Sequence, residues 1–383
     1  MKCKNLINVL DENNEQQNFI VTLNLNPEKA VFLYELNLEN REEFSNIKKH
    51  LNEKLPNTEI VEEYIEKINS EDIEKVLIKF KDEDTFVNLS CGKRIMNLLV
   101  CKVTEKLEMK SVCVDIENEC ILDLSDGKCK KLNVVMKDIE VKDFIESTGG
   151  EIISHSTSWF NNKNIREFID YIILNYDSWE KLKKILSTVS STEEHDYMNE
   201  KSIINITQAD ENERKEYKRV LDEFQQFDFF TYAYESQNKI ILNFKGVETK
   251  TLFLKTGTWF EIFVYNIVKE IKEVDDIKSG VVFLWDDEER HVRNEIDVLA
   301  SINSKLIYIS CKDTSKYGIE ALNELEVYGA QIGGEEIRKI LVATKEPYKR
   351  SVILRAKEMG IDIVVFHGSV KDFKKELEKI ILS

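Results

Sequence analysis

The sequence predicts an α/β protein with three parts: an N-terminal domain on an open parallel sheet, a mostly helical connector, and a C-terminal α/β/α domain. Apolar strand-like segments alternate with amphipathic helical segments before residue 140 and again after residue 257. Helical patterns dominate the stretch between them. A length of 383 residues fits two domains and a small connecting module better than one domain. We therefore place the parts at residues 1–140, 141–250 and 251–383.

The first part reads as strands separated by helices. The strand-like segments are LINVL, AVFLYEL, TEIVEEY and DTFVNLS. The helix-like segments are QNFIVTLNL, REEFSNIKKHLNEKL, EDIEKVLIKF and GKRIMNLLVCKVTEKL. Such alternation predicts a Rossmann-like open parallel sheet. The part ends in hairpin-like strands, SVCVDIEN and CILDLSDGKCKKLNVV, with Asp126-Gly127 as a turn.

The connector contains helical segments and one helix followed by two strands. VKDFIESTGG and IREFIDYIILNYDSWEKLKKILSTV have helical spacing, and ERKEYKRVLDEFQQFDFFTYAYESQNKIILNF reads as a helix and a hairpin. A helix followed by a hairpin resembles a winged-helix unit. Two roles are open for it: DNA recognition, or coupling and dimer packing. The acidic helix around residues 211–223 favours coupling.

The third part contains a predicted β-hairpin over residues 294–314, NEIDVLASINSKLIYISCKDT, which carries its candidate catalytic residues. Apolar residues alternate along both halves, at Ile296, Val298 and Ala300 and at Ile307, Ile309 and Cys311. Asn303-Ser304 is suited to the turn. A turn centred there places Glu295 opposite Lys312 and Asp297 opposite Ser310.

The polar face of this hairpin has two interpretations. Glu295 and Lys312 can form a weak cross-strand ion pair on a solvated sheet face. Alternatively, the carboxylates hold a divalent cation, and Lys312 orients the attacking water on a phosphodiester. The preceding segment GTWFEIFVYNIVKEI predicts an amphipathic helix with Glu261 in its first turn. Glu261 either favours the helix N-terminus or adds a third carboxylate to the hairpin.

An acid on a helix, an acid on a strand and a lysine on the next strand follow the order of parts in PD-(D/E)xK nucleases. Residues 257–383 resemble the restriction-endonuclease-like domain of CRISPR ancillary nucleases that fuse a CARF sensor to a nuclease. The matching stretches are GTWFE, NEIDVL, ISCK and ELEVYGAQIGG. After the hairpin, helix, strand, helix, strand and helix patterns complete an α/β/α core.

The resemblance implies the site residues and the cofactor. Its catalytic residues are Asp297, Lys312, Glu295 and Glu261. Its metal ligands for Mg²⁺ or Mn²⁺ are Asp297, Glu261 and the carbonyl of Cys311. Ser310 departs from the family pattern, since an acid usually precedes the lysine by two residues. A bound water and the Cys311 carbonyl then complete the coordination sphere.

The strand-loop-helix segment NLSCGKRIMNL predicts a ligand site in the first part. Backbone amides at a helix start bind anions, and a glycine there allows close approach. The segment is not a Walker loop, and as a bare motif it also fits an ordinary connection. It resembles the loop of CARF domains that binds cyclic oligoadenylate, which implies ligand contacts by Ser90, Gly92, Lys93, Arg94 and Asn88. The polar loop after the first strand, DENNEQQN, is either solvated or contributes Asp11, Asn13, Gln17 and Asn18.

Composition limits the remaining possibilities. A net charge of −17 argues against a protein that coats nucleic acid through a general positive field. Residues 344–360 are locally basic, and two interpretations are open for them: a track for phosphates, or a solvated helix edge. The basic residues are Lys345, Lys349, Arg350 and Arg355. Seven cysteines without a CxxC pair and five scattered histidines argue against structural zinc and a histidine-ligated metal. We find no apolar run of membrane-spanning length and no signal-peptide core, so we expect a cytoplasmic protein without membrane contact.

The resemblance implies a homodimer in which paired CARF domains bind one cyclic tetra-adenylate as allosteric activator in type III CRISPR defence. Binding would activate metal-dependent cleavage of DNA, RNA or both, in single-stranded or supercoiled form, with low sequence specificity. Two alternatives stay open. One is a PD-(D/E)xK nuclease, such as a resolvase or restriction enzyme, that ignores cyclic nucleotides. The other is a non-enzymatic sensor whose decayed site is marked by Ser310.

Overall fold

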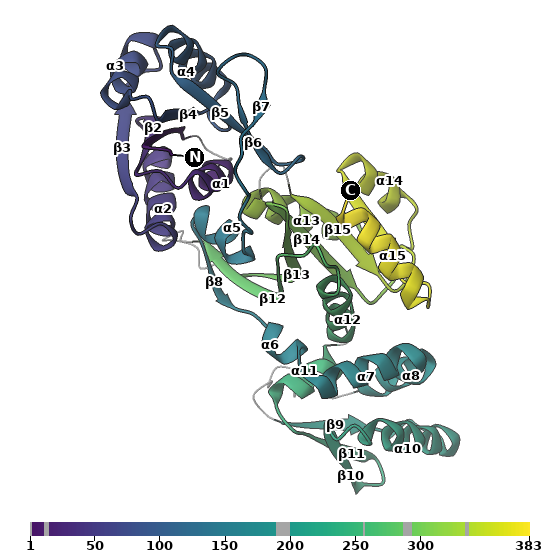
Figure 1. Cartoon of the computed structure of the whole chain (residues 1–383). Helices are drawn as coiled ribbons and strands as arrows, with labels where there is room; N and C mark the ends of the chain where they lie inside the picture. The colour runs from purple at the N-terminus through teal and green to yellow at the C-terminus, as the bar shows by residue number, and fades with distance from the viewer. Residues whose placement is uncertain (1, 11–14, 189–199, 256, 286–292, 334–336) are drawn as a thin grey trace.

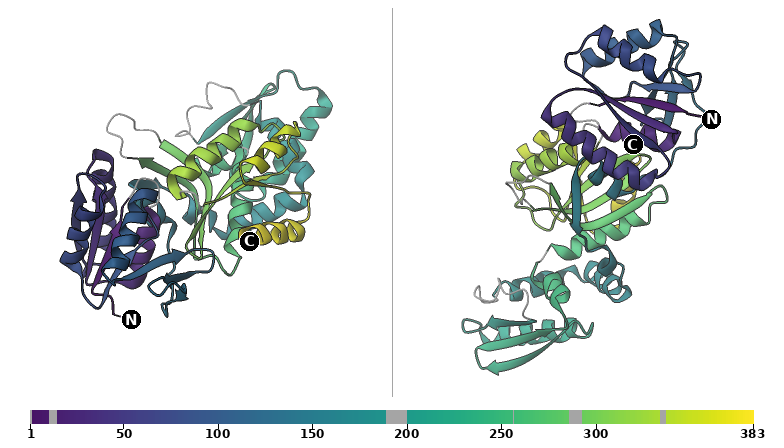
Figure 2. Two further views of the ribbon diagram at one scale, coloured as in Figure 1. Left: turned by 90° about the horizontal axis from the view of Figure 1, so that it is seen from above. Right: turned by 90° about the vertical axis from the view of Figure 1, so that its left-hand side faces the viewer.

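Three bodies follow one another in this computed structural model, which describes residues 2–10, 15–188, 200–255, 257–285, 293–333 and 337–383. The N-terminal domain lies at one end and the C-terminal α/β domain lies in the centre (Figures 1 and 2). The middle of the sequence forms a module at the other end, on the far side of the C-terminal domain. Residues 157–250, which make up most of the predicted connector, therefore do not lie between the other two domains.

The N-terminal domain contains a seven-stranded sheet in the order β3-β2-β1-β4-β5-β6-β7. Its strands are β1 (Asn5–Val9), β2 (Lys29–Glu35), β3 (Glu59–Ile65), β4 (Thr85–Asn88), β5 (Lys110–Asp115), β6 (Cys120–Asp123) and β7 (Lys130–Lys131). Its helices are α1 (Glu15–Leu25), α2 (Leu38–Lys54), α3 (Ser70–Phe80) and α4 (Arg94–Lys106). The first five strands in this order are parallel, and β5, β6 and β7 are antiparallel. The predicted parallel sheet with a hairpin-like end is confirmed.

The strand order reverses direction between β1 and β4. The chain moves from β1 through β2 to β3 on one side, and then returns to place β4 on the other side of β1. The loops after β1 and β4 therefore leave the same sheet edge in opposite directions. Ligands of open α/β sheets bind in the crevice at this switch point.

The C-terminal domain contains a six-stranded mixed sheet in the order β16-β15-β14-β13-β12-β8. Its strands are β8 (Gly150–Ser154), β12 (Asp276–Trp285), β13 (Arg293–Ile302), β14 (Lys305–Lys312), β15 (Arg338–Ala343) and β16 (Ile361–Val365). Its helices are α5 (Val141–Ser147), α12 (Thr258–Lys269), α13 (Ile319–Gly333), α14 (Ser351–Glu358) and α15 (Val370–Ile381). Sequence analysis missed β8 and β12. Strand β8, from the predicted connector, forms the sheet edge beside β12.

The middle module packs helices against a small antiparallel sheet in the order β10-β11-β9. Its elements are α6 (Thr157–Phe160), α7 (Lys163–Leu174), α8 (Tyr176–Leu186), β9 (Lys201–Asn205), α10 (Glu211–Gln225), β10 (Phe230–Ser236), β11 (Lys239–Phe244) and α11 (Val247–Leu254). The predicted helix and hairpin are α10, β10 and β11, whereas β9 was not predicted. Aromatic side chains join this module to α12 in one buried core, including Phe168, Trp179, Phe253 and Trp259.

The N-terminal domain contacts the C-terminal domain directly through α5. A single hydrophobic cluster contains Leu6 and Phe19 of the first domain, Phe144 of α5, and Leu299 and Tyr308 of the central sheet. Burial of apolar surface therefore continues from one domain into the other. No helix in the described part of the chain combines the length and apolar character needed to cross a membrane.

Candidate active site and ligand crevice

The hairpin of β13 and β14 has the predicted register. The strands pair antiparallel with Val298 opposite Ile309, Leu299 opposite Tyr308 and Ile302 opposite Lys305. Asn303 and Ser304 form the turn with φ angles of 51° and 61°. Positive φ at both central residues gives the right-handed twist that two-residue hairpins prefer. The alternation of apolar residues was therefore sufficient to fix this register.

The two strands of the hairpin separate just before the acidic residues. Their pairing ends at Val298–Ile309, while β14 continues beside β15 as far as Lys312, which pairs with Ala343. Asp297 fills the resulting gap. One of its carboxylate oxygens, Oδ2, accepts from the backbone N–H of Cys311 at 2.7 Å and lies 3.4 Å from the hydroxyl of Ser310. The side chain thus replaces a carbonyl of the β-ladder and is fixed against β14.

The carbonyl of Cys311 is directed into the same gap. The carbonyl of Lys312 accepts from the backbone N–H of Thr344, which shows that Lys312 turns its backbone groups towards β15. Backbone groups of adjacent strand residues point to opposite sides, and the N–H and C=O of one residue share a side. The Cys311 carbonyl therefore lies on the β13 side, together with its N–H.

The face alternation predicted for β13 is wrong at Asp297. Ile296 packs in the cluster shared with the N-terminal domain, whereas Val298 and Ala300 pack in the cluster with α12. On the neighbouring strand, Gly280 has a φ of +55° and lies between the paired positions that face Ile296 and Val298. The predicted solvated face is also wrong, since Leu299 and Tyr308 are buried. Both faces of the paired part of the hairpin are therefore covered.

Glu261 reaches the site from the first turn of α12. The helix is not amphipathic as predicted, because ten of its residues from Thr258 to Val268 are buried. The Glu261 side chain belongs to this buried set. A carboxylate placed in a helix that packs on all sides needs a positive partner or a proton.

The surroundings of Glu261 and of Asp297 both oppose ionisation of the carboxyl group. Burial and the negative charge of Asp297 raise the pKa of Glu261 to about 8. Burial also raises the pKa of Asp297, although Lys312 and the Cys311 N–H act in the opposite direction. A buried acid and a partly buried acid, both with raised pKa values, together with a nearby lysine form an arrangement typical of functional sites. A divalent cation between them would remove this repulsion.

Lys255 was not predicted to belong to this site. Its ammonium donates to Glu295 Oε1 at 2.9 Å, and both side chains are about half exposed. Burial lowers the pKa of Lys255, but the negative charges of Glu261, Glu295 and Asp297 outweigh this effect and raise it. The predicted pairing of Glu295 with Lys312 is wrong. Glu295 is held outside the buried pair of carboxylates by Lys255.

The metal-free chain should lose stability as pH rises through the pKa of Glu261. The folded state keeps a proton on Glu261 up to about pH 8, whereas the unfolded chain releases it near 4.5. The folded state therefore binds more protons in this interval, and the free energy of unfolding falls as pH increases. Urea denaturation in a chelator, between pH 5 and about 9, should show a smaller decrease for Glu261→Gln than for the wild type. An equal slope in both would contradict the raised pKa.

Asp313 follows Lys312 and joins three elements in a buried hydrogen-bond network. Its carboxylate accepts from Trp259 Nε1 at 2.7 Å and Lys183 Nζ at 2.8 Å. It also accepts from Thr344 Oγ1 at 2.8 Å and Tyr176 OH at 3.4 Å. These donors come from α12, α8 and the loop after β15. Asp313 therefore holds the end of β14, and with it Lys312, against the start of α12 and the middle module.

The predicted ligand residues of the N-terminal domain divide into buried and exposed groups. Asn88 is buried at the end of β4, where its amide donates to Asn8 and Asn18 at 2.9 Å each and its Oδ1 accepts from Ser90. The Ser90 hydroxyl also accepts from Val114 N at 2.8 Å. Asn88, Asn18 and Ser90 thus belong to one hydrogen-bond network at the ends of β1 and β4.

The exposed group lies at the start of α4. Gly92 has a φ of +117°, and a Cβ atom there would lie 2.6 Å from Val9 Cγ1, so the tight loop requires glycine. Lys93 and Arg94 follow it and are exposed. Gln17 accepts from Cys91 at 3.9 Å, which brings α1 beside this loop. The predicted contacts Asp11 and Asn13 lie outside the described residues.

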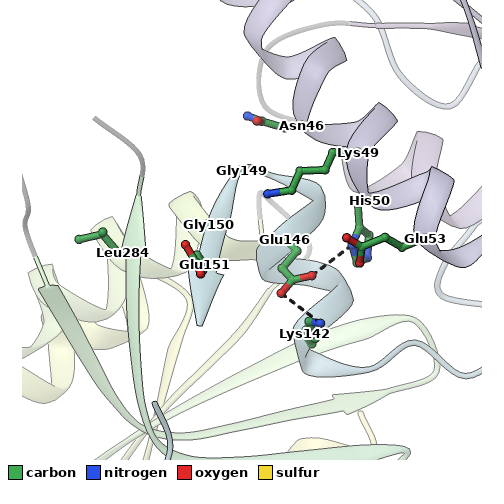
Figure 3. A pocket seen from close by; sticks show the side chains of 10 residues that line it. All are labelled: Asn46, Lys49, His50, Glu53, Lys142, Glu146, Gly149, Gly150, Glu151 and Leu284. Atoms are coloured by element: carbon green, nitrogen blue, oxygen red, sulfur yellow. Dashed lines mark ion pairs between the residues drawn. The ribbon is translucent and has the colours of Figure 1, made fainter. Parts of the chain in front are cut away.

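A separate pocket of about 270 Å³ lies between α2 of the N-terminal domain and α5 (Figure 3). His50 on α2 is buried between two carboxylates of α5, with Nε2 3.1 Å from Asp143 and Nδ1 3.3 Å from Glu146. Lys54 also binds Asp143, at 2.6 Å. The ligand atoms of His50, Glu53 and Glu146 lie within 4.8 Å of one another, a spacing that a metal ion could also use. These contacts cross-link the two domains.

Comparison with known proteins agrees with this geometry. Residues 248–382 match the family model described as Card1-like, endonuclease domain. About a third of the chain therefore resembles a Card1-like endonuclease. The match includes α12, β13 and β14, which carry Glu261, Asp297 and Lys312. The prediction of an endonuclease at this end of the chain is confirmed. A search of curated proteins gave no match.

Solved structures share the fold of nearly the whole chain. Protein VC1899 from Vibrio cholerae has a TM-score of 0.75 at 20% identity, covering 98% of this chain and 97% of that one. Can2 from Sulfobacillus thermosulfidooxidans in complex with cyclic tetra-adenylate has a TM-score of 0.69 at 18% identity, covering 99% and 96%. A type III CRISPR defence DNA nuclease activated by cyclic oligoadenylate has a TM-score of 0.56 at 13% identity, covering 100% of this chain and 52% of that one. At these identities the likeness concerns the fold.

Proposed function

We propose that this chain is a metal-dependent nuclease that cleaves DNA, RNA or both, and that cyclic tetra-adenylate bound to a homodimer activates it in type III CRISPR defence. The observation that carries the proposal is that Glu261 and Asp297, two acids with raised pKa values, and Lys312 occur together in the Card1-like region. The choice of ligand is supported by the shared fold with Can2, which was solved with cyclic tetra-adenylate.

The residues of the site fit a hard divalent cation such as Mg²⁺ or Mn²⁺. Asp297, Glu261 and the Cys311 carbonyl would hold it, since all three offer oxygen ligands. When bound, the cation polarises the phosphodiester and favours ionisation of a water. Lys312 orients the attacking water and balances charge on the phosphate. Glu295 is placed to order water at the exposed rim, while Lys255 offsets the negative charge of the acids.

A set of contacts joins α2 of the N-terminal domain to the strand that carries Asp297. Helix α2 is bound to α5 through His50 and Lys54, as described above. The backbone N–H of Val141, where α5 begins, donates to Asp276 at the start of β12 at 3.1 Å. Strand β12 then pairs with β13, and β13 is the strand that carries Asp297. A ligand that favours one placement of α2 can therefore bias the active site, provided that it binds that state more tightly.

A nuclease assay with and without cyclic tetra-adenylate tests the proposal. Wild-type protein with Mn²⁺ should cleave single-stranded or supercoiled substrate only when the activator is present, and Lys312→Ala should be inactive under both conditions. Cleavage that is unaffected by cyclic nucleotides would favour a nuclease under different control. Absence of cleavage together with ligand-dependent thermal stabilisation would favour a sensor without catalysis.

Lys93→Ala should weaken the binding of cyclic tetra-adenylate by roughly ten- to a hundredfold, because a charge-assisted hydrogen bond to a phosphate contributes about 1.5–3 kcal/mol. Isothermal titration calorimetry with the full chain measures this change. Lys106→Ala is the matched control: Lys106 lies at the other end of α4 and binds Glu74 at 2.7 Å. Equal affinity of the two variants would exclude Lys93 from the ligand site.

A further inference from the structure

Two loops meet at the end of the sheet where β14 and β15 finish. Lys312, the last residue of β14, pairs with Ala343, the last residue of β15. The chain continues into residues 313–318 and 344–350, and the backbone N–H of Tyr348 donates to the carbonyl of Ser315 at 3.0 Å. The loops therefore begin at the proposed catalytic lysine and join a few residues beyond it.

These loops enclose an open pocket of about 570 Å³ whose lining includes Lys316, Ile319, Tyr348 and Lys349. The Tyr348 side chain is 85% exposed, so its ring is available at the rim of the pocket. Nearby Tyr317 differs, since it is buried and its hydroxyl donates to the carbonyl of Lys345 at 3.1 Å. Tyr317 is explained by the fold, whereas a tyrosine as exposed as Tyr348 adds little to the core.

Positive charge surrounds the exposed ring. Lys316, Lys349 and Arg350 are exposed, and none of them has an ion pair with another described residue. Lys345 in the same loop differs, because it lies 3.5 Å from Glu180. Glu320 is the acid in the pocket lining. Glu346 is a second acid in the loop, and it lies 3.6 Å from His367. On a chain of net charge −17, three cations without an ion pair among the described residues outnumber these two acids and form a local site for phosphates.

We propose that these residues, the Tyr348 surface (Lys316, Tyr348, Lys349 and Arg350), bind single-stranded nucleic acid next to the active site. One base stacks on the Tyr348 ring, and Lys316, Lys349 and Arg350 hold the flanking phosphates. A base within a duplex has both faces covered by its neighbours, so an isolated ring of this kind selects an unpaired strand. The inference rests on the proposed function, because its ligand is the substrate of that nuclease.

Binding to two matched strands separates stacking from charge. The measurement is fluorescence anisotropy of full-length Lys312→Ala protein with cyclic tetra-adenylate, using fluorescein-labelled oligodeoxyadenylate, its RNA counterpart, and an abasic DNA strand of equal length. Adding Tyr348→Ala should weaken binding to the oligoadenylates roughly tenfold and leave the abasic strand unchanged. Tyr348→Phe should bind as the parent does. Lys349→Ala should weaken binding to all strands and reduce the salt dependence of that binding. Glu320→Gln should strengthen binding to all strands.

Unchanged binding of oligoadenylate by Tyr348→Ala would overturn the inference. So would a Tyr348→Ala variant that changes the mass of the assembly in light scattering but binds the strands normally, since the surface would then join copies of this chain. Thermal melting of each variant controls for folding. Loss of cleavage in Lys312→Ala is a separate test, so the proposed function can stand when the Tyr348 surface fails.

Discussion

Asp297→Asn should reduce cleavage by on the order of a thousandfold or more while leaving the fold intact. An asparagine oxygen can still accept from the Cys311 N–H, which Asp297 binds at 2.7 Å, so the gap between β13 and β14 stays filled. The negative charge that would hold the proposed cation is lost. Single-turnover cleavage with Mn²⁺ and cyclic tetra-adenylate measures the effect, and urea denaturation shows that stability is retained.

Glu270→Gln is the matched control for removal of a carboxylate. Glu270 caps the opposite end of α12 and binds Lys374 at 2.5 Å on the surface. Its removal should change the cleavage rate by less than about threefold, since exposed ion pairs contribute about 1 kcal/mol or less. Comparable losses in Glu270→Gln and Asp297→Asn would mean that the chain responds to any loss of charge.

Asp313→Ala should destabilise the folded protein by about 3 kcal/mol. The substitution leaves the Trp259 indole N–H without its buried acceptor and leaves Lys183 with Glu180 as its remaining carboxylate partner, since the Asp313 side chain is 2% exposed and that of Lys183 is 12% exposed. It also releases the end of β14 from α12, so we expect cleavage to fall in the protein that remains folded. Chemical denaturation measures the first effect, and the nuclease assay measures the second.

Asp362→Ala provides the comparison for Asp313→Ala. Asp362 on β16 binds Arg338 at 3.1 Å, and both side chains are more than a third exposed. Its removal should therefore cost less than about 1 kcal/mol. If Asp313→Ala were as stable as Asp362→Ala, the network would not hold the middle module to the active site.

Local patterns in the sequence were sufficient for the hairpin and for the parallel sheet. The register of β13 and β14 follows from alternation and from a two-residue turn, both of which are local. The N-terminal strands alternate with helices and have the expected parallel order. The acids and the lysine could be proposed as site residues because their order on helix, strand and strand is itself a sequence pattern.

Features that depend on distant contacts were missed. The sequence does not indicate that β8 pairs with β12, because the two strands are more than a hundred residues apart. Lys255 is recognisable only once its ion pair with Glu295 is seen, and Asp313 only through donors on α8 and α12. The position of the middle module at the far end also follows from tertiary packing, since Trp179 and Phe253 pack beside Trp259.

The binding of Mn²⁺ to the full chain with cyclic tetra-adenylate tests the central claim most directly. Electron paramagnetic resonance counts the bound ions in the wild type, Asp297→Asn, Glu261→Gln and His50→Ala, the last removing the other possible cluster. We predict a site that is lost in Asp297→Asn and Glu261→Gln and retained in His50→Ala. If Asp297→Asn and Glu261→Gln bound as many Mn²⁺ ions as the wild type, the result would contradict a cation held between these two acids.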